Sequence, residues 1–480
     1  MTRRAALAAL AALLAACSAG PEYRRPALEM PAAWKTEPPW REAAPDDGAA
    51  KGPWWRRFDD ARLDALITRA LAASPTLVAA QARLAQARAG LASAESASSP
   101  QVSLSSRLAR QRISAVRPLT NYAVPNQSTV QSDLFGAFSV AYEVDLAGRV
   151  RSTIDGATAS SEQSAIDLEN ARLVLAADVA TAYFALRATD VELDVITRAT
   201  ALQRRSLEYA TARHDLGAAS GLDVAQQRAL LDATLTQLDV TRRQRDLLEH
   251  ALATLTGTPA PLFALAADIR PVRPPAVPLG VPSDILQRRP DVASAERAMA
   301  AANAQIGVAT AAFYPSITLS PTTYGTQAAS LSTIASTPAV VWSLGTSLLA
   351  PIFDAGRAAA GVDAARAAYD ATVANYRRVV LVAMQEVQDG ITGLAALERA
   401  AAQAGVAIGS ARRVLELATS RYEGGVATAL EVISAQQGLL ANERLAAQLQ
   451  GQQLLTTVFL VKALGGDWQR AGYDSGVSSR

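Results

Sequence analysis

The chain has 480 residues, of which 50% are hydrophobic, 5% aromatic and 19% charged, so it has the length for a sizeable core built mostly from small side chains. Its 46 basic and 44 acidic residues leave a formal charge of +2 and are interspersed, which argues against nucleic acid as a partner. A single cysteine, Cys17, and two histidines far apart in sequence, His214 and His250, argue against a disulfide, a thiol enzyme or a metalloenzyme.

Residues 1–16 have the form of a signal peptide. A positive start, Met1–Arg4, precedes twelve apolar residues, Ala5–Ala16, which are too few to span a bilayer as a helix. The tetrapeptide Leu14–Cys17 resembles the bacterial lipobox, which implies cleavage before Cys17 and a covalent lipid on its thiol. An ordinary signal whose cleavage site contains a cysteine is the alternative. Because a lipid alone is a modest anchor, we expect a second membrane element.

The remainder of the chain contains two copies of one plan. An offset of 215 residues aligns Pro100 with Pro315, and an offset of 208 aligns Ala147–Arg149 with Ala355–Arg357. The change of offset indicates a longer loop in the first copy. We expect repeats at residues 60–257 and 283–465, each with a helix, a β-hairpin, a long helix, a tip turn and a second helix.

Proline spacing predicts unusually long helices. Proline costs about 3 kcal/mol inside a helix, and none occurs from Asn126 to Thr258 or after Pro351. A helix from near Gly148 to near Leu216 would be about 100 Å long at 1.5 Å per residue. We expect the following helices at about Leu222–Leu255 and Leu430–Leu464, after tip turns at residues 217–221 and 424–428.

The second long helix carries a coiled-coil pattern, which indicates that the helices pack on other helices. Its interruptions are Glu398, Gly405 and Arg412. Apolar residues with four-three spacing form the predicted seam: Met384, Val387, Ile391, Leu394, Ala401, Ile408, Leu415 and Tyr422.

Period-two segments precede both long helices. From Val130 to Leu146 the even positions are mostly apolar, whereas the odd positions include Gln131, Asp133 and Glu143. The second copy has the same pattern, with Val340, Trp342, Leu344, Leu348 and Ile352 on one face. We expect two-faced β-hairpins at residues 101–146 and 316–353, with polar loops at residues 111–128 and 325–338.

Four such strands cannot close a membrane barrel, and an open edge in lipid leaves backbone groups unsatisfied. The strands are therefore expected to be shared between chains, eight strands from two chains or twelve from three, and twelve leave a lumen. A soluble β-sandwich on a helical stalk is the alternative. The export signal weighs against it, as does the lack of another helical span of 18 apolar residues.

Several motifs give a family resemblance that covers nearly the whole mature chain. They are Val281–Val292, the opening Cys17 with Gly20–Pro26, Trp54-Trp55 before Phe58, and the two tip turns. The chain resembles the TolC-like outer membrane factors, especially the OprM- and NodT-type outer-membrane efflux lipoproteins. This implies an α+β membrane protein and a homotrimer, in which a twelve-stranded outer-membrane β-barrel, four strands per chain, continues into a long α-helical coiled-coil periplasmic barrel.

The resemblance also implies domain roles. Residues 17–59 would be a lipidated, extended N-terminal segment, while residues 258–282 would form an equatorial linker and residues 466–480 an equatorial tail. The protein would lie in the bacterial outer membrane, lipid-anchored and extending into the periplasm.

The function implied is that of an exit duct in a tripartite efflux pump of the RND type, which passively conducts drugs or other small toxic compounds through a gated channel. Its partners would be a periplasmic adaptor, an inner-membrane transporter that supplies the energy, and outer-membrane lipid. A type I protein secretion duct and a non-conducting structural lipoprotein tether are the alternatives. An enzyme is not expected, because neither a P-loop nor a Ser/His/Asp motif is recognisable, and no cofactor is expected beyond the lipid on Cys17.

The gate would lie at the tips of the two helical hairpins. The repeat pairs Asp223 with Glu431, and in threefold symmetry each acid becomes a ring of three that favours cations. By resemblance, Asp223 and Tyr422 match a latch between hairpins, and Glu431 matches an aperture acid. Ala427 and Ser434 depart from the family pattern at two gate positions, and Glu431 has the alternative of a solvated charge at a helix start.

The tip turns would also contact the adaptor, because small residues allow close contact with a helical tip, although a plain turn needs small residues too. The residues implied are Gly217, Ala218, Ala219, Ser220, Gly425, Val426, Ala427 and Thr428.

Overall fold

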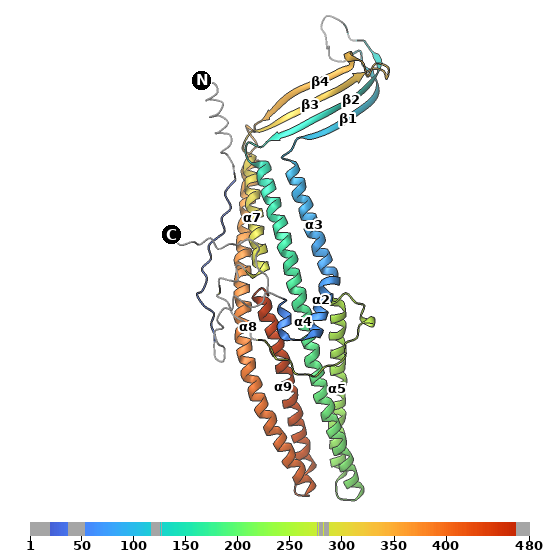
Figure 1. Cartoon of the computed structure of the whole chain (residues 1–480), viewed down its shortest axis with the longest axis vertical. Helices are drawn as coiled ribbons and strands as arrows, with labels where there is room; N and C mark the ends of the chain where they lie inside the picture. The colour runs from blue at the N-terminus through green and yellow to red at the C-terminus, as the bar shows by residue number, and fades with distance from the viewer. Residues whose placement is uncertain are drawn as a thin grey trace. The chain divides into compact units, whose positions relative to one another are not determined.

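The computed structural model describes residues 20–36, 53–116, 125, 127–275, 277, 282 and 288–466 (Figure 1). The predicted signal peptide, Cys17, most of residues 281–287 and nearly all of the predicted tail lie outside the described residues. The chain consists of two compact units. One contains Arg83–Ser164 and Ala295–Tyr376 with the described residues up to Ala27, and the other contains Leu28–Ala82, Ala165–Ser294 and the chain from Arg377.

The first unit carries one four-stranded antiparallel sheet in the order β1-β2-β3-β4. The strands are β1 (Gln101–Ile113), β2 (Thr129–Val144), β3 (Ser316–Ala328) and β4 (Val340–Leu349). Two predicted loops are therefore too long, because β1 and β3 extend three to four residues further than expected. Ile352 lies beyond the end of β4, since the strand stops before Pro351, which has no N–H for a ladder.

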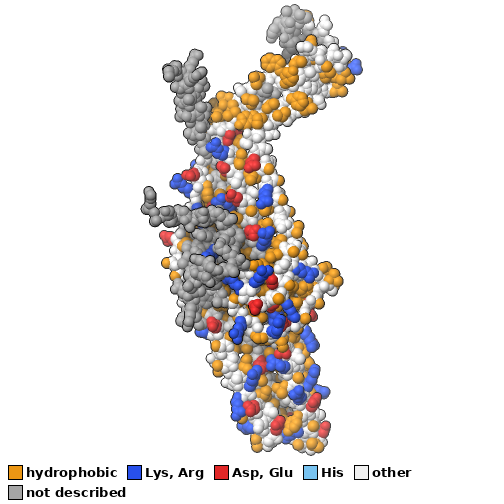
Figure 2. All heavy atoms as spheres, in the orientation of Figure 1, with side chains coloured by type: hydrophobic (Ala, Val, Ile, Leu, Met, Phe, Trp, Pro, Cys, Tyr) orange, Lys and Arg blue, Asp and Glu red, His pale blue; other side chains and the backbone are white. Residues whose placement is uncertain are grey.

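The sheet has an apolar face and a polar face. One cross-strand row joins Leu104, Phe138, Tyr324 and Trp342, and each of these side chains is more than half exposed. The neighbouring row, on the other face, joins Ser103, Ser139, Thr323 and Ser343. Figure 2 shows hydrophobic side chains gathered over the strands. The alternation predicted from the period-two segments is thus present across four strands.

A register shift lies within β3 between Ser320 and Thr323. Pro321 falls in this interval and lacks a backbone N–H, which favours a bulge over a regular ladder. The shift explains why the apolar residues of β3 change from odd positions, Ile317 and Leu319, to an even one, Tyr324.

The described residues contain seven α-helices and three short 3₁₀ segments, at Trp54–Phe58, Ala260–Leu262 and Thr337–Ala339. Both long helices have 67 residues and both helices that follow them have 35. Their bounds are α2 Ala61–Ala73, α3 Pro75–Ser96, α4 Arg149–Asp215, α5 Gly221–Leu255, α7 Pro290–Ala311, α8 Arg357–Glu423 and α9 Ala429–Ala463. The positions of α4, α5 and α9 agree with the prediction to within one residue at each end.

The predicted seam of α8 is confirmed by burial. All eight seam residues are buried or partly buried, from Met384 to Tyr422, whereas the three interruptions, Glu398, Gly405 and Arg412, are exposed. Among the described residues no single helix is long and apolar enough to cross a membrane. The bent pair α2 and α3, with a 43° break, passes that test by length and composition.

Part of the motif Gly20–Pro26 docks on α7 in the first unit. Asn303 Nδ2 donates to the carbonyl of Pro21 at 2.9 Å. A Cβ on Gly20 would lie 2.7 Å from the Cα of Gly307, a distance at which something must shift. Glycine at position 20 therefore allows the extended segment to lie directly against the helix.

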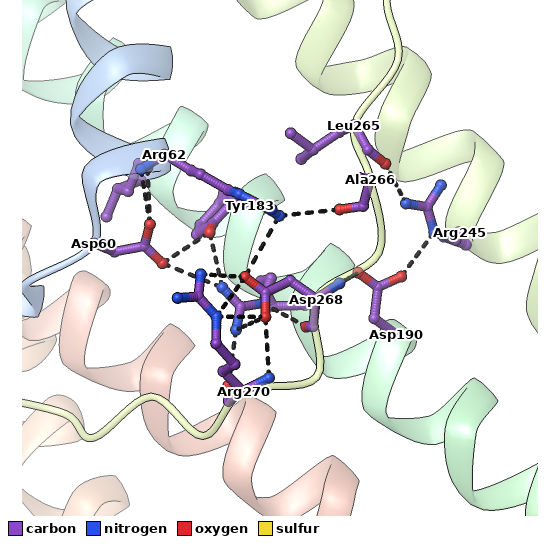
Figure 3. Close-up of polar contacts among 11 residues, drawn as sticks. Asp60, Arg62, Tyr183, Asp190, Arg245, Leu265, Ala266, Asp268 and Arg270 are labelled. Carbon is purple, nitrogen blue, oxygen red and sulfur yellow. Dashed lines mark hydrogen bonds and ion pairs between the residues drawn. The ribbon is translucent and has the colours of Figure 1, made fainter.

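In the second unit, charged side chains hold the irregular segment that follows α5 (Figure 3). Arg187 of α4 is 4% exposed and donates from Nε to the carbonyl of Asp268 at 2.7 Å and from Nη2 to that of Arg270 at 2.8 Å. Its Nη1 donates to Tyr183 Oη at 2.9 Å and to Asp60 Oδ2 at 3.2 Å. Burial, with the hydrogen bond to Asp60, raises the pKa of Tyr183 to about 12.

A second set of charged groups extends this network to α5. Arg245 Nε donates to Asp190 Oδ1 at 2.7 Å, and the backbone N–H of Asp268 donates to Asp190 Oδ2 at 3.0 Å. The N–H of Leu265 donates to Glu249 Oε1 at 3.2 Å. Hydrogen bonds from and to charged side chains thus satisfy the backbone of residues 265–270, which we call the clamp segment, in place of a β-ladder.

Candidate functional site

The first hairpin tip is a glycine turn closed by a capping box. Gly217 has φ +70°, and its N–H donates to the carbonyl of His214 at 2.8 Å. This turn ends α4. Ser220 is the N-cap of α5: its Oγ accepts from the N–H of Asp223, and the Asp223 carboxylate accepts from the N–H of Ser220 at 3.0 Å. Asp223 is therefore used, within its own chain, to start α5.

The second tip has the same turn but a weaker cap. Gly425 has φ +74°, and its N–H donates to the carbonyl of Tyr422 at 3.1 Å. Thr428 precedes α9, and its side chain makes no capping hydrogen bond. Glu431 lies in the first turn of α9, where a carboxylate is favoured by the helix dipole, and its Oε2 is 4.0 Å from Nη2 of Arg421. Both side chains of this pair are about half exposed.

Arg213 joins the two tips. Its Nη1 donates to the backbone carbonyl of Tyr422 at 3.1 Å, close to the C-terminal end of α8. The guanidinium lies 5.0 Å from the ring centre of Tyr422 and 5.9 Å from that of Tyr209. The two rings meet edge to face at 6.0 Å. One cation of the first hairpin therefore contacts both a helix terminus and an aromatic face of the second hairpin.

Tyr422 is 8% exposed and packs in an apolar cluster. Its hydroxyl has no hydrogen-bond partner among the described residues, and burial raises the pKa of this phenol despite the opposing charge of Arg213. Among the described residues, Asp223 hydrogen-bonds Ser220, and the Tyr422 hydroxyl has no partner, so a latch between Asp223 and Tyr422 stays a prediction. The other buried members of the apolar cluster around Tyr422 are Ala418, Ala429, Val432 and Ala435, and Leu415 and Ala427 pack against this cluster.

A groove of about 690 Å³ runs between α8 and α9 at this tip. Its walls include the exposed apolar side chains of Val414, Leu417 and Leu430, and Arg421 and Glu431 also line it. Glu431 is therefore an accessible carboxylate beside an apolar surface. Ser434, one of the two residues that depart from the family pattern, lines the same groove and adds a small polar group.

The predicted adaptor-contact residues all lie in the two turns, and most are exposed. Ala219 and Ala427 are partly buried. Those exposed are Gly217, Ala218, Ser220, Gly425, Val426 and Thr428.

The offset of 208 residues makes Arg213 the counterpart of Arg421, but sequence reasoning gave Arg213 no role. The available signal was a basic residue in the last turn of α4, a position that suits a cation beside helix carbonyls. Its contact with Tyr422 joins residues 209 positions apart, which single-sequence spacing does not reveal.

The described residues thus combine a two-faced antiparallel sheet with two long helical hairpins that end in glycine turns. The model of the outer membrane efflux protein family matches residues 66–258 and 281–466. The chain therefore belongs to this family, and it is an outer-membrane efflux channel component and not an enzyme.

Relatives and solved structures agree with this assignment. The chain is 31% identical over 465 residues to the pyoverdine export outer membrane protein OpmQ of Pseudomonas aeruginosa, covering 95% of each. It is 31% identical over 465 residues to the antibiotic efflux pump outer membrane protein ArpC of Pseudomonas putida, covering 96% of this chain and 95% of ArpC. The structure of the outer-membrane channel OprN matches with a TM-score of 0.85 and 28% identity, over 94% of this chain and 99% of OprN.

Proposed function

We propose that three copies of this chain form a gated duct that passively conducts small toxic compounds out of the periplasm in a tripartite pump of the RND type. The observation that carries the proposal is the open sheet, whose apolar row is exposed and whose edge strands, β1 and β4, each pair on one side among the described residues. Neighbouring copies would pair those edges, turn the apolar face to lipid and turn the polar face to a lumen.

Three partners follow from this proposal. A covalent lipid on Cys17 would add a second anchor in the outer membrane, a periplasmic adaptor would contact the tip turns, and an inner-membrane transporter would supply the energy. Equal helix lengths, 67 and 35 residues in both halves, support two copies of one plan.

The proposed gate is the junction of the two tips. In the arrangement described, Arg213 hydrogen-bonds the backbone carbonyl of Tyr422 and so joins the end of α4 to the end of α8. Opening would separate the hairpins and break the Arg213 contacts, while Glu431 would remain available to attract cations.

The oligomeric mass of the detergent-extracted protein tests the proposal. A trimer supplies twelve strands, and planar-bilayer recordings of it should show conductance. A stable monomer would leave two open edges and defeat the duct. A trimer without conductance would favour the structural tether, whereas export of a polypeptide by the intact pump would favour the type I secretion duct.

Gly217→Trp and Gly425→Trp are each expected to reduce drug resistance to the level of a strain that lacks the channel, with trimer assembly retained. Apart from the glycine itself and its two chain neighbours, no residue has an atom within 4 Å of a Cβ built at either position, so the bulky side chain would project outward where the adaptor is proposed to bind. Growth inhibition in a complemented deletion strain measures the effect.

Backbone strain needs its own control, because both glycines have positive φ. Asparagine tolerates this conformation better than other side chains, so Gly217→Asn and Gly425→Asn should retain resistance. Full resistance in both tryptophan variants would contradict an adaptor surface at the turns.

Glu431→Gln is expected to lower the cation preference of the channel, because it removes a ring of three carboxylates from the proposed aperture. The reversal potential under a salt gradient measures this preference. Glu416→Gln is the matched control, since Glu416 is an exposed acid of α8 that pairs with Arg413. Equal reversal potentials for Glu431→Gln and the wild type would count against an aperture position.

A further inference from the structure

The apolar face of the sheet carries two cations at the end of β1, Arg110 and Arg112. Both are in phase with Leu108, which is 81% exposed on that face. In the register, Arg110 lies opposite Ser132 and Arg112 lies opposite Val130. Both arginines are exposed, and they are the only charged residues on the apolar face of the four described strands.

The two arginines lie just beyond one end of an apolar band of defined height. On β2 this band extends from Val144 to Leu134, which are ten positions apart and therefore about 34 Å apart at about 3.4 Å per residue. In a strand tilted by about 40° that length spans a height of about 26 Å, close to the band of about 25 Å in outer-membrane barrels. The next cross-strand pair after Leu134 is Ser132 with Arg110.

The direction of β1 places this end on the outer side of the membrane in the proposed duct, on which the inference rests. β1 begins at Gln101, shortly after α3, and ends at Ile113, away from the helices of its unit (Figure 1). Because the helices of the proposed duct lie in the periplasm, Arg110 and Arg112 reach the level of the lipid headgroups in the outer leaflet.

The sheet supplies no carboxylate to neutralise these two arginines. Residues 101–144 contain two acids, Asp133 and Glu143, and residues 316–349 contain none. Both acids lie on the polar face, where Asp133 pairs with Arg107 and Glu143 pairs with Arg149. Because every copy in a ring has the same segments, the sheet of a neighbouring copy brings no further acid to the apolar face.

Most hydrogen-bond donors of the two guanidinium groups are unused. Arg112 donates from Nε to Ser128 Oγ at 3.1 Å, and Ser128 carries no charge. Arg110 makes no hydrogen bond or ion pair within the part of the chain that the structure describes. Guanidinium groups bind phosphate with two parallel N–H donors, and the apolar stem of an arginine lies favourably along an apolar surface. The two side chains therefore suit an anion at the edge of lipid.

We propose that Arg110 and Arg112 form a binding site for the phosphate groups of a phosphorylated glycolipid in the outer leaflet. Side chains two positions apart on a strand are about 7 Å apart, so each arginine can bind a phosphate of one headgroup. The acyl chains lie against Leu104 and Leu108, which are more than half exposed on the same strand. Three copies in a ring give three such sites, and each fixes the height of the barrel in the membrane.

Native mass spectrometry of the full-length, detergent-extracted protein tests the site. The probes are diphosphorylated lipid A, the same lipid with both phosphates removed, and inorganic phosphate. We expect diphosphorylated lipid A to bind at least fivefold more tightly than the dephosphorylated lipid, and we expect inorganic phosphate not to displace it, because the acyl chains contribute to binding. This comparison uses the wild type alone, so it does not depend on how well a variant folds.

The double variant Arg110→Gln/Arg112→Gln should bind diphosphorylated lipid A no more tightly than the dephosphorylated lipid. Arg107→Gln is the matched control, because it removes a cation from the polar face of the same strand, and it should keep the wild-type preference.

Three results would overturn the proposal: equal binding of both lipids by the wild type, an unchanged preference in the double variant, or displacement of the lipid by inorganic phosphate. The first two would leave the arginines as solvated charges at the rim, and the third would leave an anion site without lipid. Trimer mass and conductance are measured on the same preparations, so any of these results in a conducting trimer contradicts the lipid site and leaves the duct standing.

Discussion

Replacing Arg187 with alanine is expected to lower the free energy of unfolding by about 3–5 kcal/mol, which is the usual cost of removing one partner from a buried ion pair. The side chain is 5% exposed and bonds the clamp segment to Asp60 and Tyr183. Without it, Asp60 and Asp268 would remain buried with fewer partners. Guanidinium unfolding of the detergent-solubilised protein, followed by far-UV circular dichroism, measures the loss.

The control for Arg187→Ala is Arg242→Ala, which removes an exposed ion pair with Asp239. Exposed pairs contribute about 0.2–1 kcal/mol, so the two losses should differ severalfold. A loss from Arg187→Ala no larger than that of the control would contradict the importance of the network.

Protonation of Asp268 in the clamp segment is expected to make the fold less stable at low pH. Hydrogen bonds from the Arg270 side chain, assisted by the charge of Arg187, hold the pKa of Asp268 well below its usual range. A depressed pKa stabilises the fold at pH values above the unfolded pKa of about 3.9, and this contribution is lost as the pH falls towards the folded value. Asp268 should therefore contribute fully at pH 7.

Arg213→Ala is expected to open the channel. The change removes a charge-assisted hydrogen bond to the Tyr422 carbonyl and two cation–π contacts, and a net loss of about 1–2 kcal/mol changes a two-state ratio about 5- to 30-fold. Planar-bilayer recordings should show a higher open fraction. Cells with the variant should also become sensitive to a large hydrophilic antibiotic that the closed channel excludes.

Arg421→Ala is the control for the Arg213 prediction. Arg421 has the equivalent position in the second hairpin, but its side chain is more than half exposed and its ion pair with Glu431 is long, at 4.0 Å. It should change the open fraction little. An unchanged open fraction in Arg213→Ala would contradict the role proposed for Arg213 in keeping the gate closed.

The local pattern of the sequence predicted most of the fold. Proline exclusion and four-three spacing located α4, α5, α8 and α9, because those signals depend only on residues near each other in the chain. Period-two alternation located the four strands, although their ends differed by up to four residues. The bulge near Pro321 was missed, and its signal was the change of phase from Leu319 to Tyr324.

The site was predicted only in outline, since its contacts join distant positions. Spacing identified the glycine turns and placed acids at helix starts, but it could not show which face of α4 meets α8. Arg213 and Arg187 act through partners 209 and 81 residues away, respectively.

The even number of strands has a consequence for assembly. In an antiparallel sheet of four, β1 and β4 run in opposite directions, so the β4 edge of one copy can pair with the β1 edge of the next without breaking the alternation. In the proposed ring, each subunit therefore pairs its β1 edge with one neighbour and its β4 edge with the other. A subunit with one blocked edge would leave the ring open, so mixed expression should lower the yield of intact channels by more than the fraction of defective chains.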